Sequence, residues 1–155
     1  MTRLTFAQAR RVGLVQKKGG GHKRLFKTSR AVWDCKKIPG GILFIIPENM
    51  PSLNVWKRWH WAEQDRYLKE LTENLKMLAI SAGLPTMEKA KVEVTHYFRA
   101  NNKHDKDNYT PKQILDSLRY ARVIAEDNAE VLELPEPVFK IDREAWRTEI
   151  RVIQK

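Results

Sequence analysis

The chain has 155 residues, of which 42% are hydrophobic, so it is long enough and apolar enough for one globular domain with a packed core. Its longest apolar run, residues 42–46, is far shorter than the roughly 20 residues of a membrane-spanning helix. We therefore expect a cytoplasmic protein without a membrane segment. The single cysteine, Cys35, excludes an internal disulfide and a cysteine-rich zinc site.

The positive charge is concentrated at the N-terminus. Residues 1–38 contain 11 Lys and Arg and one acidic residue, a balance of +10, whereas residues 39–155 contain 18 basic and 18 acidic residues. This division predicts a basic, flexible N-terminal extension over residues 1–38 and a neutral folded domain over residues 39–155.

The extension has the composition of a nucleic-acid contact. A basic segment attracts polyanions because their counterions are released on binding. Phe6, Phe26 and Trp33 stand among the charges and can stack on bases. Nucleic acid is thus the expected partner, with Lys23 and Arg24 as candidate contacts. A solubilising tail or a cloning remnant is the alternative.

The folded domain is predicted to begin with a buried strand at residues 42–46 (ILFII), after which two prolines impose an extended polar loop. Residues 55–61 (VWKRWHW) then combine three tryptophans with two basic residues and a histidine. Either these side chains pack into the core at the start of a helix, or they form a cationic and aromatic surface for nucleic acid. The second interpretation selects three DNA contacts, Lys57, Arg58 and Trp59.

A long helix and a second strand follow. Apolar residues from Trp61 to Ala82 recur every three or four positions, which predicts one apolar stripe on a helix over about residues 60–82. Apolar and polar residues alternate over residues 91–99 (KVEVTHYFR), which predicts a strand with His96 on its apolar side. A core histidine with its hydrogen bonds satisfied is therefore favoured over a ligand at this position.

The last part of the chain predicts one more helix and further strands. Thr110 is a good N-cap and Gln113 completes a capping box, so we expect a helix to about residue 122. A strand is expected at about residues 130–134, and residues 138–141 and 146–153 predict an antiparallel hairpin. The order strand, helix, strand, helix, strand, strand indicates an α+β fold with a mixed sheet and two helices packed on it.

Two carboxylates, Asp105 and Asp107, stand between the second strand and the second helix. Side chains two apart in an extended segment face the same way, and a return of the chain after the helix can bring Asp127 beside them. Oxygen ligands without a thiolate suit Mg²⁺ or Mn²⁺, which would offset the repulsion between like charges. Two other interpretations fit less well. An EF-hand calcium loop needs a ligand where Tyr109 stands and a glycine where Thr110 stands. Capping of a helix N-terminus by acidic residues accounts for one aspartate but not for Asp127.

These residues carry a resemblance to a known family. The run D-x-D-N, then K-x-x-x-D-x-L, then E-D before a valine-bearing strand resembles the RusA family of Holliday-junction resolvases. The matching residues are Asp105, Asp107, Asn108, Lys112, Asp116, Leu118, Glu126 and Asp127. The tryptophan-rich segment is similar to the family's loop after its first strand, so the resemblance spans residues 42–153. One residue more than is usual separates Asn108 from Lys112, and Lys103 or Lys106 can substitute for Lys112.

The resemblance implies a homodimeric, Mg²⁺-dependent endonuclease that nicks four-way DNA junctions symmetrically in recombination and repair. It implies metal-binding, catalytic roles for Asp105, Asp107 and Asp127, and a catalytic cation at Lys112. The supporting residues and further DNA contacts are then Asn108, Asp116, Lys103 and Lys106. Two alternatives remain: a non-catalytic nucleic-acid-binding module with the same basic and aromatic surface, and a protein whose metal ion only ties the loop to the helix.

Overall fold

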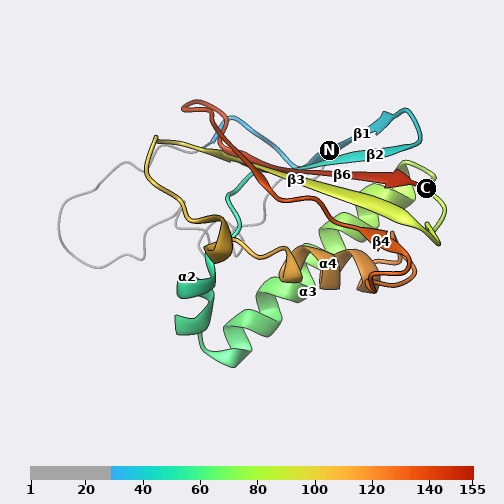
Figure 1. Cartoon of the computed structure of the whole chain (residues 1–155), viewed down its shortest axis with the longest axis horizontal. Helices are drawn as coiled ribbons and strands as arrows, with labels where there is room; N and C mark the ends of the chain where they lie inside the picture. The colour runs from blue at the N-terminus through green and yellow to red at the C-terminus, as the bar shows by residue number, and fades with distance from the viewer. Residues whose placement is uncertain (1–28) are drawn as a thin grey trace.

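The computed structural model describes residues 29–155, which form one mixed sheet with helices on one of its faces (Figure 1). The strands are β1 (Asp34–Ile38), β2 (Gly41–Ile46), β3 (Ala90–Phe98), β4 (Leu132–Glu133), β5 (Val138–Ile141) and β6 (Arg147–Gln154). The helical elements are α2 (Leu53–Arg58), α3 (Trp61–Ser81), the 3₁₀ turn η1 (Lys106–Asn108) and α4 (Lys112–Tyr120). The predicted contacts Lys23 and Arg24 lie outside the described residues.

The sheet has the order β1-β2-β6-β3-β4, and β5 also pairs with β3. Neighbouring strands from β1 to β3 are antiparallel, whereas β4 and β5 both run parallel to β3. The predicted α+β class with a mixed sheet is therefore confirmed. The element order differs from the predicted one, because β1 precedes the first expected strand and α2 precedes the first expected helix.

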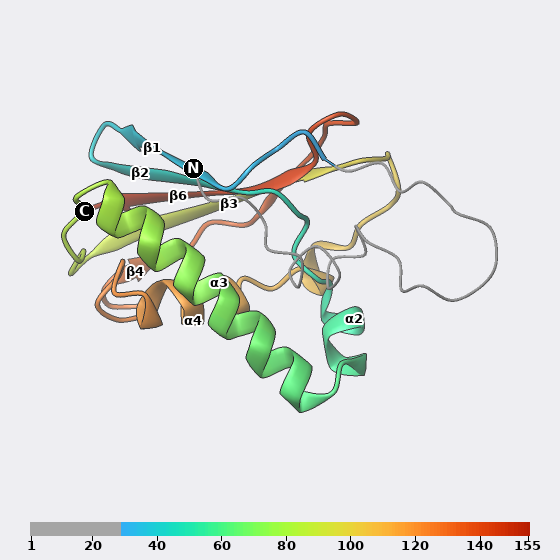
Figure 2. The ribbon, with the colours of Figure 1, turned by 180° about the vertical axis from the view of Figure 1, so that it is seen from behind.

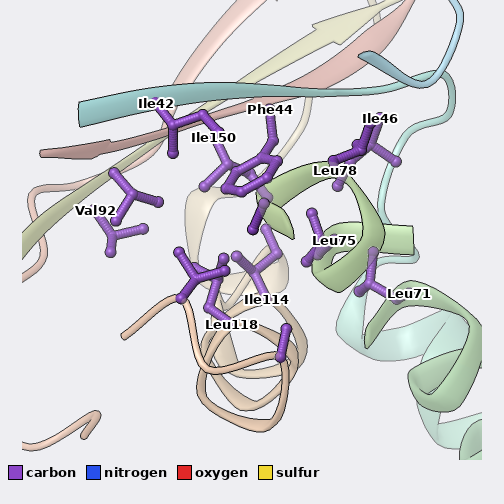
Figure 3. Close-up of a cluster of buried hydrophobic side chains, with 14 of the residues drawn as sticks. Ile42, Phe44, Ile46, Leu71, Leu75, Leu78, Val92, Ile114, Leu118 and Ile150 are labelled. Atoms are coloured by element: carbon purple, nitrogen blue, oxygen red, sulfur yellow. The ribbon is translucent and has the colours of Figure 1, made fainter. Parts of the chain in front are cut away.

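The hydrophobic core lies between one face of the sheet and helices α3 and α4, which cover that face together (Figures 1 and 2). The long strands alternate buried and more exposed residues, as the period of a strand requires. Figure 3 shows the interleaved side chains, among them Ile42, Phe44, Ile46, Leu71, Leu75, Leu78, Val92, Ile114, Leu118 and Ile150. No helix within residues 29–155 is long and apolar enough to span a membrane.

Strand β1 lies inside the segment that was predicted to be an extension. It pairs with β2 along its whole length, and the preceding Trp33 is only 2% exposed. The tight turn between the two strands contains Gly40 at a φ of 75°, a conformation that favours glycine. Residues 34–38 thus belong to the fold, in contrast to the predicted boundary after residue 38. Their sequence, DCKKI, is short and charged, so the strand depends on pairing with β2.

The predicted hairpin at the C-terminus is wrong. β5 and β6 lie on opposite edges of β3: His96 pairs with Phe139 of β5 on one side and with Thr148 of β6 on the other. The connection therefore crosses the end of β3 and spans two strand spacings of about 4.8 Å each. Alternating polarity identifies a strand, but it does not say which strand will be its neighbour.

Candidate functional site

The acidic pair lies in the loop that follows the carboxyl end of β3 and leads to α4. Asp105 is the N-cap of η1, and its Oδ1 accepts a hydrogen bond of 3.0 Å from the backbone N–H of Asp107. The segment is therefore a tight turn and not the expected extended stretch. Both side chains are exposed, and neither forms an ion pair with another residue of 29–155. Two neighbouring carboxylates are thus left without a compensating cation in this part of the chain.

An aromatic cluster, formed by His96, Phe98, His104, Tyr109 and Phe139, holds this turn on the sheet. The ring of His104 stacks on Phe98 with centroids 3.6 Å apart and planes at 12°. Tyr109 packs edge-on against Phe98 and Phe139 at 5.3 and 5.5 Å. The Tyr109 hydroxyl lies 3.3 Å from Nδ1 of His104. Because His104 precedes the acidic pair and Tyr109 follows it, both ends of the turn are attached to β3 and β5.

His96 forms the floor of the aromatic cluster. It is 3% exposed, and burial lowers its pKa from 6.5 to about 4, with a smaller contribution from the charge of His104. The imidazole is therefore neutral near pH 7. The prediction that His96 lies in the core is confirmed, but the expected hydrogen bonding is not, because its buried Nδ1 has no hydrogen-bond partner among residues 29–155. Burial also raises the pKa of the Tyr109 phenol, which stays protonated.

The same turn contacts the segment that carries α2. The backbone N–H of Asn54 donates a 3.0 Å hydrogen bond to Oδ1 of Asn108. On the other side, Nζ of Lys106 lies 3.4 Å from a carboxylate oxygen of Glu136, which precedes β5. Asn108 and Lys106 therefore tie η1 to two segments that are more than 25 residues away in the sequence, and this makes Asn108 a positioning residue of the loop. Lys103 is exposed in the same loop.

The three tryptophans of residues 55–61 divide between the two interpretations. Trp56 and Trp59 pack against each other at 5.5 Å and against Tyr67 at 5.7 and 5.4 Å, beside the core. Trp61 is 73% exposed, so it does not belong to the apolar stripe of α3 as expected. Core packing thus accounts for Trp56 and for much of Trp59, the predicted DNA contact. Lys57 and Arg58 are exposed in the last turn of α2.

Asp127 lies at the opposite end of β3 from the acidic pair. The segment after α4 returns beside the start of β3, where Ile124 forms a bridge with Met87 and Ala125 donates to the Met87 carbonyl. Asp105 follows the other end of this nine-residue strand, which is about 30 Å long. Because β3, α4 and β4 form a parallel crossover, the end of α4 cannot meet the end of β3.

The expected grouping of three aspartates is therefore wrong for a single chain. Oδ1 of Asp127 lies 4.0 Å from a guanidinium nitrogen of Arg119 and raises the pKa of that group. Among residues 29–155, no group of three or more His, Cys, Asp or Glu side chains is placed to hold a metal ion. Within the described part of the chain, the structure keeps Asp105 with Asp107 but separates both from Asp127.

Helix α4 begins close to the acidic pair. Its first residue, Lys112, is exposed, and Asp116 follows one turn later. The N-cap is Pro111, which has no capping side chain, so the predicted capping box of Thr110 and Gln113 is wrong. Proline fits this position because its φ of −81° lies in the range that its ring permits. The first turn of α4 therefore keeps backbone N–H groups that no side chain caps.

Sequence reasoning missed the rings that hold the acidic turn. His104 and Tyr109 flank the D-x-D-N motif directly, and Phe139 lies in a predicted strand. The positions of these rings in the chain were visible, but their contact with Phe98 depends on β5 lying beside β3. No protein-family model and no curated protein matches this chain. The likeness to the RusA family therefore rests on the motif residues alone.

Proposed function

We propose that this protein is a Mg²⁺-dependent endonuclease, with Mn²⁺ as a possible substitute, that nicks four-way DNA junctions in the cytoplasm. The observation that supports this function most directly is the exposed pair Asp105 and Asp107 on a turn that aromatic rings attach to the sheet. Lys112 and the uncapped first turn of α4 follow within a few residues. Symmetric nicks in two arms require two sites, so the proposal includes a homodimer.

The donor set fits a hard divalent cation. Mg²⁺ is commonly bound by one or two carboxylates, several waters and a substrate phosphate. Asp105 and Asp107 can supply the two carboxylates without a third residue. When bound, the ion would stabilise the charge of the phosphate and provide a reactive hydroxide.

The neighbouring residues supply the rest of the chemistry. Lys112 can neutralise charge that develops on the phosphate oxygens. The N–H groups at the start of α4 provide a second, uncharged anion contact, because they point along the helix axis. Lys103, Lys57 and Arg58 are exposed and can hold the flanking DNA backbone.

One specific observation favours the second candidate, a nucleic-acid-binding module that does not cut. The third carboxylate implied by the resemblance, Asp127, is at the other end of β3 and is paired with Arg119. A protein that only binds branched DNA needs the cations and the anchored loop, but it does not need a complete set of metal ligands.

An end-labelled four-way junction and a matched linear duplex separate the two candidates. We expect paired nicks on the junction in Mg²⁺, and we expect EDTA or Asp107→Asn to abolish them while binding remains. Asp65→Asn is the matched control, because Asp65 is an exposed aspartate on α3 with its own partner Lys69. Tight junction binding without cleavage in Mg²⁺ or Mn²⁺ would reject the endonuclease and support the binding module.

The salt dependence of binding tests DNA as the partner of the N-terminal segment. Residues 1–28 contain eight Lys and Arg and no acid, and their deletion leaves β1 intact. We expect the slope of log affinity against log salt to become shallower by up to about seven, since each phosphate contact contributes about 0.9. An unchanged slope would exclude this segment as a DNA contact.

A further inference from the structure

A pocket of about 470 Å³ lies between β5 and the loop that leads from β3 to the acidic pair. Its walls include Phe98 and Phe139 from the two strands, and Asn101, Asn102 and His104 from the loop. The pocket is open to solvent, and Ile141, which is 46% exposed, also lines it. It therefore adjoins the proposed metal site but does not include its carboxylates.

The apolar part of the pocket is made of flat rings. Phe98 and His104 lie parallel, and Phe139 stands almost perpendicular to Phe98 at 84° with centroids 5.3 Å apart. Phe98 is only 6% exposed and is stacked on His104, so the partly exposed rings of His104 and Phe139 are the ones that a ligand can reach. A lining of rings favours another planar ring over a branched aliphatic group.

The polar part of the pocket has unused hydrogen-bonding groups. Nε2 of His104 is buried and has no hydrogen-bond partner. Within residues 29–155, the side-chain amides of Asn101 and Asn102 also form no hydrogen bond. Amide groups provide a donor and an acceptor side by side, which is the pattern that reads the edge of a base. Lys140 lines the same pocket and adds a positive charge.

We propose that this pocket binds one unpaired nucleobase of the DNA strand whose phosphate lies at the acidic pair. A base inside a duplex is stacked on both faces and cannot enter, so occupation of the pocket requires an unpaired or displaced nucleotide. The pocket would then favour branched DNA if a base leaves its stack more readily at the branch point than inside a duplex, and it would contribute a sequence preference through Asn101 and Asn102. This inference rests on the proposed function for its biological substrate, but binding of a base can be measured without cleavage.

The first experiment uses the full chain and the four deoxynucleoside monophosphates, followed by ¹H–¹⁵N spectra. We expect shifts at the side-chain amides of Asn101 and Asn102 and at the backbone of residues 139–141. Deoxyribose 5-phosphate, which lacks a base, should leave these signals unchanged. Equal shifts with deoxyribose 5-phosphate, or no shifts with any nucleotide, would overturn the proposal and leave a phosphate site or an unoccupied pocket.

The second experiment compares two variants with the same substitution at different places. Ile141→Glu puts a charge in the lining of the pocket, whereas Ile80→Glu changes an isoleucine on α3 that is more exposed, at 68% against 46%. We expect Ile141→Glu to weaken junction binding about tenfold, because a carboxylate in the pocket lining disfavours entry of the base and removes a gain comparable to that of one stacked base. The double variant Asn101→Ala and Asn102→Ala should remove the preference among the four nucleotides.

The outcomes separate this inference from the proposed function. Junction cleavage by the wild type together with equal binding by the Ile141→Glu and Ile80→Glu variants would overturn the base pocket and leave the endonuclease. Nucleotide shifts at the pocket without junction binding would overturn the endonuclease and support the base pocket. If peptides shift the signals of these residues and nucleotides do not, the base pocket is also overturned.

Discussion

The two ends of β3 differ in what surrounds them. At its start, Met87 and the chain after α4 are buried against each other, and the nearby Asp127 is paired with Arg119. At its far end, the chain forms a loop that rests on aromatic rings, and the two aspartates of this loop have no cationic partner among residues 29–155. The first end has its charge compensated inside the fold, and the second presents uncompensated charge to solvent.

This difference indicates where the chemistry of the protein lies. A charged side chain in an ion pair is already compensated by its partner, so it attracts a charged ligand less strongly. Two neighbouring exposed carboxylates without a cationic partner in the described fold are instead available to a divalent cation. The far end of β3 is therefore the better candidate for a metal site. Of the three carboxylates that the resemblance implies, Asp105 and Asp107 lie at this end, and Asp127 lies at the start of the strand.

The largest expected effect comes from exchanging one aspartate at each end for asparagine. Asp107→Asn should reduce junction cleavage about a hundredfold to a thousandfold, because a metal ligand and its charge are lost. Asp127→Asn should change cleavage by about threefold or less, because only a surface ion pair is lost. Binding of Mn²⁺, followed by electron paramagnetic resonance, gives a readout that does not depend on cleavage. Equal losses in both variants would mean that Asp127 joins the site from a second copy of the chain.

The second-largest effect is expected on the free energy of unfolding, which we compare between a variant of the core and a variant of the anchored loop. Leu118→Ala removes a fully buried side chain of α4 and should lower the free energy of unfolding by about 2–5 kcal/mol. His104→Ala removes one stacked ring from the aromatic cluster and should cost about 1 kcal/mol. Urea unfolding measured by circular dichroism gives both values. A loss at His104 as large as that at Leu118 would show that the loop belongs to the main core.

The pH dependence of stability probes the buried histidine under the loop. The pKa of His96 is about 4 in the folded protein against 6.5 in the unfolded chain, so the unfolded state takes up the proton first as the pH falls. Its contribution to stability is thus complete above pH 6.5 and is lost between pH 6.5 and 4. The slope should reach at most about 1.4 kcal/mol per pH unit. Urea titrations of wild type and His96→Gln check this, and an identical slope in both would exclude His96 as its source.

The smallest effect is expected at the ion pair near the start of β3. Arg119→Gln leaves Asp127 without its partner, but both side chains are about one-third exposed and water can solvate the remaining charge. The midpoint of urea unfolding should therefore shift less than in His104→Ala, and added salt should make the shift smaller still. A larger shift than in His104→Ala would contradict the view that this end is held by its apolar contacts.

The local hydrophobic pattern of the sequence was sufficient to predict the elements that bury a regular apolar stripe or face. The helix expected at residues 60–82 is α3, and the strand expected at residues 91–99 is β3 with His96 in the core. Both elements are long, and their hydrophobic period recurs several times. Neighbouring residues along the chain therefore carry enough information to define them.

Contacts between distant segments decided the rest. Strand β1 exists because β2 offers it an edge, and β5 is separated from β6 because β3 lies between them. The sequence by itself determined the α+β class, the main helix and the adjacency of Asp105 to Asp107. The tertiary structure decided that the return after α4 places Asp127 beside the start of β3, away from Asp105 and Asp107. The physical reason is direction: a helix that connects two parallel strands ends beside their starts, and no local pattern records which strands are parallel.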